Sequence, residues 1–577
     1  MYTKQYTQLH IRIMNFNNYK YEKIDIDKTK EKFSSLIRNF SNSQNIEEQT
    51  RYMDEIIKLR NYLDTMTTLV SIRHSINTDD EYYDKENDYC DEISPILFGY
   101  TSEFYKALIS SKFRAELEER YGKFLFDLAE LTLKTFDEKI IPELQEENRL
   151  SSKYSKLIAS AKIDFDGEEK NLSQMVPYTQ SKDRNVRIDA SRKVAQFFKE
   201  NTKEFDEIYD NLVKVRTEIA QKLGFRNFVE LGYARLLRLD YNPEMVASYR
   251  KQVLENIVPL HTELRKRQEK RLGLDKLRFY DEPIKFNSGN ADPHGDPQWI
   301  LNHGKTMYKE LSPETDEFFS FMTERNLLDL LSKKGKMSGG YCTYIPDYKS
   351  PYIFANFNGT AHDIDVLTHE AGHAFQVYES RGYEIPEYLW PTYEACEIHS
   401  MSMEFLTWPW MKLFFEDDTE KYKFIHLSES LLFIPYGVTV DEFQHWIYEN
   451  PDASPSERRK KWLELEKKYL PTRDYGEVED LKEGIFWFRQ GHIFSSPFYY
   501  IDYTLAQICA FQFWIKAQEN REKTWQEYLA LCRLGGSRPF FKLMEAANLS
   551  NPFNEGTIAS VIPHIRKFLE SINDMEL

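Results

Sequence analysis

The stretch DVLTHEAGHAFQVYES, residues 365–380, places two histidines four positions apart, with a glutamate directly after the first. Residues at i and i+4 lie on one face of a helix, so His369 and His373 can offer their imidazoles to one metal ion. Glu370 cannot be a third ligand in that geometry, but its carboxylate can reach a water bound to the ion and take its proton. The spacing therefore predicts a helix that holds zinc.

Patterns on either side of this stretch indicate a mainly helical protein. Residues 47–76 have apolar positions at intervals of three and four among charged ones, as an amphipathic helix does, and similar patterns recur from about 27 to 280. Glycine, proline and alternating aromatic residues interrupt them between about 277 and 361, which predicts turns and short strands directly before the histidines. We expect an extension (1–26), an N-terminal helical lobe (27–200) and a catalytic helical domain (201–577).

An acidic cluster, PTYEACEIHSMSMEF at 391–405, can supply the third protein ligand that a catalytic zinc needs. Glu397 and Glu404 are seven apart and share a helical face, so one carboxylate can bind metal while the other orients a ligand histidine. Glu394 lies one turn earlier on nearly the same face, and spacing alone does not exclude it as the third metal ligand. His399 points elsewhere if Glu397 points inward, and we expect it to be a packed or surface residue.

HEAGH, followed 24 residues after its second histidine by the glutamate of EIHSMSME, resembles the M3 family of zinc oligopeptidases. The chain looks closest to its oligoendopeptidase F and Pz-peptidase branch. The resemblance implies a two-lobed, zincin-like helical fold with a small sheet beside the active-site helix and a deep cavity that admits only short peptides. It implies one zinc per chain on His369, His373 and Glu397, with Glu370 as general base and Glu404 supporting a ligand.

The later stretch RQGHIFSSPFYYIDYTLAQ, 489–507, resembles the family segment in which a histidine and spaced tyrosines bind substrate and stabilise the transition state. Position by position, His492, Tyr499 and Tyr503 take these roles. Tyr500 is an alternative, because the spacing from the histidine is a looser match than the metal motif.

The segment IFANFNG, 353–359, is the expected edge strand beside the zinc. An edge strand can pair with an extended peptide, so Ala355 and Phe357 are expected to offer main-chain groups to substrate. Gly340 and Tyr341 are expected to form a flexible turn that closes on it.

Charge and composition indicate which classes of partner the protein can bind and where it is located. A net charge of −17 over 577 residues disfavours nucleic acid. The sequence contains no run of about 18 apolar residues, so we expect no membrane span. The first residues lack the apolar core of a signal peptide. The five scattered cysteines, without a CxxC pair, disfavour a disulfide framework. We expect a cytoplasmic protein whose partners are short peptides, and the sequence leaves its oligomeric state open.

The function expected from these observations is zinc-dependent cleavage of internal bonds in short oligopeptides. A zinc carboxypeptidase of similar helical build is the first alternative, because Arg473 and Arg489 lie near the tyrosines in sequence and a fixed charge can recognise a chain end. A peptide-binding module that has lost catalysis is the second. The intact Glu370 argues against it, since binding alone has no chemical need for that carboxylate.

Overall fold

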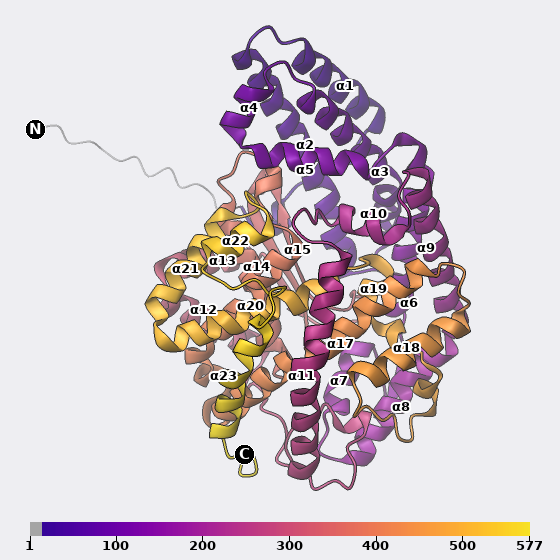
Figure 1. Cartoon of the computed structure of the whole chain (residues 1–577), viewed down its shortest axis with the longest axis vertical. Helices are drawn as coiled ribbons and strands as arrows, with labels where there is room; N and C mark the ends of the chain where they lie inside the picture. The colour runs from indigo at the N-terminus through magenta and orange to yellow at the C-terminus, as the bar shows by residue number, and fades with distance from the viewer. Residues whose placement is uncertain (1–13) are drawn as a thin grey trace, which may run out of the picture.

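The computed structural model describes residues 14–577, in which 23 α-helices carry most of the chain (Figure 1). The N-terminal helices follow the amphipathic patterns of the sequence, and side chains of Asp25, Asn45 and Asp80 cap the first three of them. The bounds are α1 (Ile26–Asn42), α2 (Ile46–Ile76), α3 (Glu81–Ile109), α4 (Arg114–Tyr121), α5 (Lys123–Lys134), α6 (Ile141–Ala159), α7 (Leu172–Thr179), α8 (Arg184–Glu200) and α9 (Thr202–Lys222).

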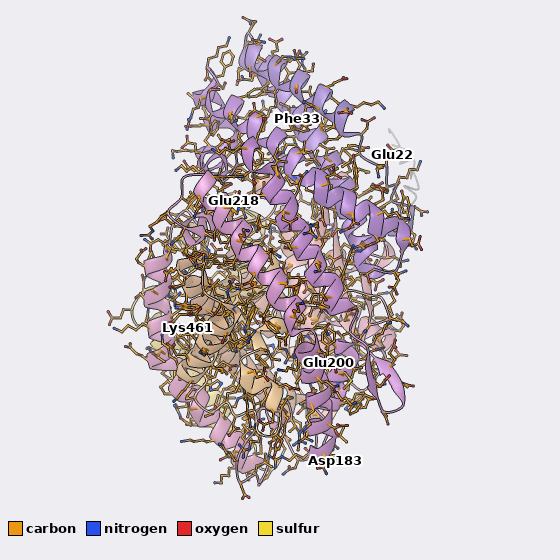
Figure 2. All side chains as sticks on the ribbon, turned by 90° about the vertical axis from the view of Figure 1, so that its right-hand side faces the viewer. Glu22, Phe33, Asp183, Glu200, Glu218 and Lys461 are labelled. Atoms are coloured by element: carbon orange, nitrogen blue, oxygen red, sulfur yellow. The ribbon has the colours of Figure 1, made fainter. Side chains whose placement is uncertain are left out.

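The helices of residues 27–200 extend along the whole long axis of the molecule. Phe33 of α1 lies near one end in Figure 2, and Asp183, which caps α8, lies at the other. A hairpin that the sequence patterns did not predict, β1 (Ile163–Phe165) with β2 (Glu168–Lys170), separates α6 from α7. Its turn holds Asp166 and Gly167 at φ of 54° and 78°, the left-handed values that an Asp-Gly pair adopts readily.

The described part of the predicted extension packs against the body of the protein. Phe16 and Tyr19 are buried, and the Tyr19 hydroxyl lies 2.9 Å from that of Ser350 in the central sheet. Residues 1–13 lie outside the described residues. The boundaries at 26/27 and 200/201 stay predictions.

The central sheet has three strands in the order β3–β5–β4: β3 (Leu328–Leu331), β5 (Ser350–Phe357) and β4 (Tyr341–Ile345). β5 pairs with β3 in parallel and with β4 in antiparallel, so the expectation of an edge strand at 353–359 is wrong. Ala355 and Phe357 are buried, and the Ala355 carbonyl accepts a bond from Lys336 Nζ. The strands at the edges are β3 and β4.

Helices α10 (Phe228–Arg235), α11 (Pro243–Arg271), α12 (Pro297–Leu311) and α13 (Pro313–Glu324) precede this sheet. The helices after it are α14 (His362–Ser380), α15 (Tyr393–Leu406), α16 (Lys412–Phe415), α17 (Thr419–Glu449), α18 (Pro455–Tyr469), α19 (Gly491–Ser495), α20 (Tyr500–Glu519), α21 (Arg521–Leu534), α22 (Phe540–Ala546) and α23 (Thr557–Ser571). One continuous hydrophobic core joins both sets, from Phe16 to Leu569.

Helix α14 packs closely on β5 and on α15, and α15 packs on α20. A Cβ at Gly372 of α14 would lie 2.6 Å from Ser400 Cα and 2.7 Å from the His399 carbonyl oxygen. Such distances are too short for non-bonded atoms, so the glycine lets the two helices approach. Helix α15 therefore fills the space beside Gly372.

Residues near the end of the described chain bind side chains of helix α11. Arg267 and Arg271 both donate to Asp574, which follows α23 and is 303 positions from Arg271.

None of the helices within residues 14–577 combines the length and apolarity that crossing a bilayer requires. All five cysteines carry free thiols.

Candidate metal and catalytic site

Three side chains from α14 and α15 converge on one point. His369 Nε2 and His373 Nε2 lie 3.2 and 3.3 Å from Glu397 Oε2, and one donor atom from each residue lies within 4.8 Å of the others. Zinc–ligand bonds of about 2.0–2.2 Å in a tetrahedron separate the donor atoms by about 3.4 Å. The donor set and its spacing therefore fit a zinc ion with three protein ligands.

Glu404 fixes the orientation of the first histidine. Its Oε1 lies 2.7 Å from His369 Nδ1, and its Oε2 lies 2.7 Å from Nε2 of His426. The Trp408 indole donates to His426 Nδ1 over 3.2 Å, so His426 presents its Nε2–H to the carboxylate. With His369 donating from Nδ1, the lone pair of its Nε2 faces Glu397 and the metal position.

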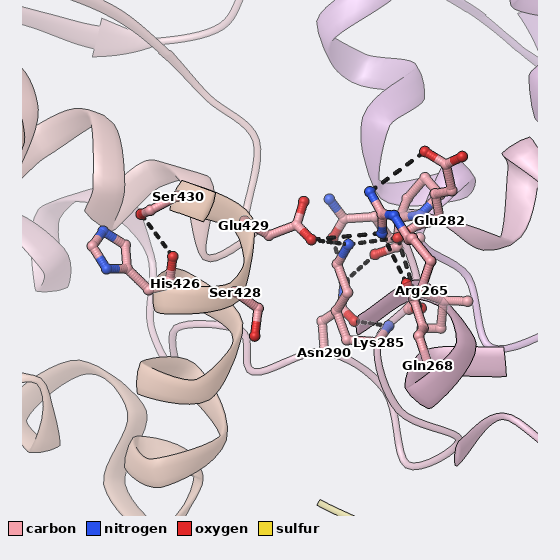
Figure 3. A network of polar contacts seen from close by, with 12 residues as sticks. Arg265, Gln268, Glu282, Lys285, Asn290, His426, Ser428, Glu429 and Ser430 are labelled. Atoms are coloured by element: carbon pink, nitrogen blue, oxygen red, sulfur yellow. Dashed lines mark hydrogen bonds and ion pairs between the residues drawn. The ribbon is translucent and has the colours of Figure 1, made fainter. Parts of the chain in front are cut away.

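Helix α17, which carries His426, is anchored on its opposite side. One turn further along, Glu429 lies 2.6 Å from Lys285 Nζ and 3.8 Å from the Arg265 guanidinium (Figure 3). Burial lowers the pKa of Lys285 to about 8, and Glu429 opposes that shift. These ion pairs tie α17 to α11 and to the loop after it.

Glu397 is also held from two sides. The Tyr499 hydroxyl donates to Oε1, and the Ser400 hydroxyl donates to Oε2 over 2.9 Å. Tyr499 therefore orients the carboxylate of the metal triad in this structure.

His492 and Tyr503 form a second polar pair facing the triad. His492 Nε2 lies 3.1 Å from the Tyr503 hydroxyl, while Gln490 Nε2 donates to His492 Nδ1 over 2.8 Å. The Tyr436 hydroxyl donates to Gln490 Oε1, which fixes that amide and leaves His492 with its proton on Nε2. Burial lowers the pKa of His492 to about 4, so the imidazole is neutral near pH 7.

Glu370 lies beside the metal position with a carboxylate oxygen free. It is buried, and among residues 14–577 no group hydrogen-bonds its Oε2. A Cβ at Gly340 would lie 3.3 Å from Glu370 Oε1 and 3.4 Å from the Phe354 carbonyl oxygen, so a glycine keeps this approach open. Burial raises the pKa of Glu370, which strengthens the carboxylate as a base.

These groups line a cavity of about 630 Å³. The predicted site residues in its wall are Gly340, Tyr341, His369, Glu370, His373, Glu397, His492, Tyr499 and Tyr503. Tyr341 is tied down rather than free, because its hydroxyl lies 2.6 Å from Ser75 Oγ and its ring stacks on Phe354. Neither Ala355 nor Phe357 belongs to the wall.

A neighbouring hollow of about 410 Å³ shares Gly340, His369, Glu370, His492 and Tyr503 with the cavity and contains Glu404 and His426. Tyr500 lines this hollow, with its ring centre 5.0 Å from that of His492. The site thus has open space on two sides.

The other candidates in the acidic cluster face away from the metal position. His399 is fully buried, with Nδ1 2.7 Å from the Ala395 carbonyl oxygen. Glu394 is buried near Asp502, and burial raises the pKa of both carboxyls. Arg238 lies 2.7 Å from Asp502 and compensates its charge.

Comparison with known proteins assigns the chain. The sequence model named Peptidase M3 N-terminal domain matches residues 16–136, and that named Peptidase family M3 matches residues 177–293 and 306–561. This chain belongs to peptidase family M3. The family resemblance read from HEAGH and EIHSMSME is confirmed.

Relatives of this M3 peptidase bear out the predicted branch. A structure named PZ peptidase A with inhibitor 2 is 58% identical, with a TM-score of 0.96 over 97% of this chain and 100% of that one. A Bacillus anthracis structure, provisionally named oligoendopeptidase F, is 58% identical, with a TM-score of 0.92 over 98% and 99%. An oligoendopeptidase F homolog of Borreliella burgdorferi is 24% identical over 375 residues, 63% of this chain and 61% of the relative.

Three polar residues of the M3 peptidase site were not predicted from the sequence: Ser400, His426 and Gln490. Ser400 lies in the acidic cluster 391–405 and Gln490 in the stretch 489–507. Their polar side chains close to a candidate site residue were the sequence signal that could have identified them. His426 had none, because only the packing of α17 brings it to Glu404.

Proposed function

We propose that the protein is a zinc-dependent endopeptidase that hydrolyses internal bonds of short peptides in the cytoplasm. The observation that carries this proposal is the convergence of His369, His373 and Glu397 beside the unpartnered carboxylate oxygen of Glu370, in the wall of a cavity. We infer that this triad holds one zinc ion.

The ion, when bound, supplies a Lewis acid that polarises the peptide carbonyl and makes water more acidic. Glu370 accepts a proton from the attacking water through its free oxygen, and later gives that proton to the departing amine. Glu404 and Tyr499 keep His369 and Glu397 in position throughout.

Negative charge that develops on the peptide oxygen needs donors aimed at it. On the cavity wall the His492 Nε2–H donates to the Tyr503 oxygen, which leaves the Tyr503 hydroxyl proton free for the peptide oxygen, and Gln490 keeps the imidazole in the tautomer that does so. Tyr499 is the less suited of the two tyrosines, since its hydroxyl is engaged with Glu397.

The outer edge of β4 is the segment that we propose pairs with the peptide backbone. Gly340, Tyr341, Cys342 and Thr343 lie in the cavity wall, and β4 has a partner strand on one side only among the described residues. A peptide added there would run beside Glu370.

The test is hydrolysis of a short, internally quenched peptide blocked at both ends, with and without a chelator. We expect internal cleavage, located by mass spectrometry, that the chelator abolishes and zinc restores. Cleavage only of peptides with a free end would favour the carboxypeptidase. Zinc binding without any turnover would favour the silent module.

Replacing Glu370 by Gln isolates the proposed base. Because the amide cannot take a proton, turnover should fall by about 10²–10⁴-fold. Bound zinc, measured by atomic absorption, should remain stoichiometric, since Glu370 is not a ligand. Turnover equal to that of the unmodified protein would rule out this role for Glu370.

A further inference from the structure

Arg489 lies in an apolar hollow next to the candidate site. The hollow has a volume of about 330 Å³, and Arg489 is the one charged residue in its wall. The surrounding side chains are mainly apolar and come from distant parts of the chain, among them Leu172, Met175, Phe198 and Phe486. A cation that apolar side chains partly shield from water attracts an anion more strongly than one on an open surface does.

No such anion is present among residues 14–577. The Arg489 side chain forms no ion pair and no hydrogen bond there, and its guanidinium lies over the Phe486 ring, 5.0 Å from the ring centre. Nearby Arg473, by contrast, is paired with Glu282 at 2.8 Å and with Glu466 at 3.8 Å. Arg489 remains accessible to solvent, while the surrounding protein lowers its pKa by desolvation.

Two chain segments connect this hollow to the site. Ser338 and Arg489 line the apolar hollow, whereas Gly340 and Gln490, one or two positions further along, line the hollow that contains His369 and Glu370. Gln490 is also the residue that orients His492. A bound peptide that leaves the metal position on this side therefore passes towards Arg489.

We propose that Arg489 binds the C-terminal carboxylate of the substrate peptide, while the last side chain of the peptide occupies the apolar hollow. The guanidinium fork matches a carboxylate in shape and charge, and it keeps its proton even where desolvated. Every unmodified peptide carries this carboxylate whatever its sequence, so one arginine can serve many peptides. The inference rests on the proposed function and adds a substrate class to it: short peptides with a free, apolar C-terminal residue.

The experiment compares two N-acetylated quenched peptides of one sequence, ending in leucine, one with a free C-terminal carboxylate and one with an amide. Steady-state KM and kcat are measured for the unmodified protein, Arg489→Gln and Arg489→Lys. A charge-assisted hydrogen bond predicts that amidation raises KM about 10- to 100-fold at similar kcat. Arg489→Gln should remove most of this difference, and Arg489→Lys should keep part of it.

A matched control is Arg226→Gln, which removes a surface arginine that pairs with Glu230 outside both hollows. It should leave the preference for the free carboxylate unchanged. A third peptide, amidated but ending in glutamate, separates the two sources of a carboxylate. If the KM of this peptide equals that of the free acid, Arg489 binds acidic side chains, and the proposal that it binds the C-terminal carboxylate is wrong.

Equal KM values for the acid and the amide would overturn the inference but leave the endopeptidase proposal standing, because both peptides would still be cleaved. Absence of cleavage of either peptide at saturating concentration would instead refute the proposed function. Loss of folding in Arg489→Gln, detected by circular dichroism, leaves the decision to the acid–amide ratio of the unmodified protein and of Arg489→Lys.

Discussion

At the scale of single residues, Glu404 is the group that supports metal retention by orienting a ligand histidine. It accepts hydrogen bonds from His369 and His426, and an amide in its place can accept only one of them. Glu404→Gln should weaken metal affinity about 10- to 100-fold. Competition with a chromophoric chelator measures this, with Glu420→Gln on the exposed face of α17 as control. Affinity equal to that of the control would contradict the supporting role.

How far the sequence predicts the site differs from residue to residue. His369, Glu370 and His373 follow from one helical motif, because local spacing determines their common face. Glu397 required the family resemblance, since its spacing alone left Glu394 open. His426 was not predictable, because it reaches Glu404 only through tertiary packing.

At the scale of elements, the distance between α14 and α15 positions the metal triad. Gly372→Ala would place a methyl group against backbone atoms of Ser400 and His399, so the helices must separate. We expect a loss of about 1–3 kcal/mol in unfolding free energy, as overpacking usually costs, and weaker metal retention because Glu397 moves from the histidines. Denaturant unfolding and chelator competition measure the two effects.

Gly382→Ala is the matched control, because a Cβ there would meet no atom within 4 Å. Its stability should stay within about 0.5 kcal/mol of the parent. If Gly372→Ala behaved like this control, the close approach of the helices would not limit the site.

The sheet shows why element order is harder to predict than element type. Alternating aromatic residues predict strands before the histidines, and β4 and β5 are there. The sequence patterns did not identify the four residues of β3 as a strand. Because β3 pairs with the free side of β5, residues 353–357 lie in the central strand, and β4 is an edge strand instead.

At the scale of the whole molecule, the N-terminal helices depend on the later ones. The hydroxyl of Tyr154 in α6 donates to the Phe488 carbonyl, its ring stacks on Phe494, and Glu147 pairs with Arg216 and Arg235. Residues 27–200 expressed alone should therefore lack a cooperative unfolding transition by circular dichroism in urea. A sharp transition would mean that the predicted lobe folds independently.

The bond between Arg271 and Asp574 has a consequence during protein synthesis. The two residues are 303 positions apart, so at roughly 5–20 residues per second a ribosome reaches Asp574 about 15 to 60 s after completing α11. The face of α11 that α23 covers stays without its partner for that time. We therefore expect the nascent chain to bind chaperones at this face until Asp574 has been synthesised.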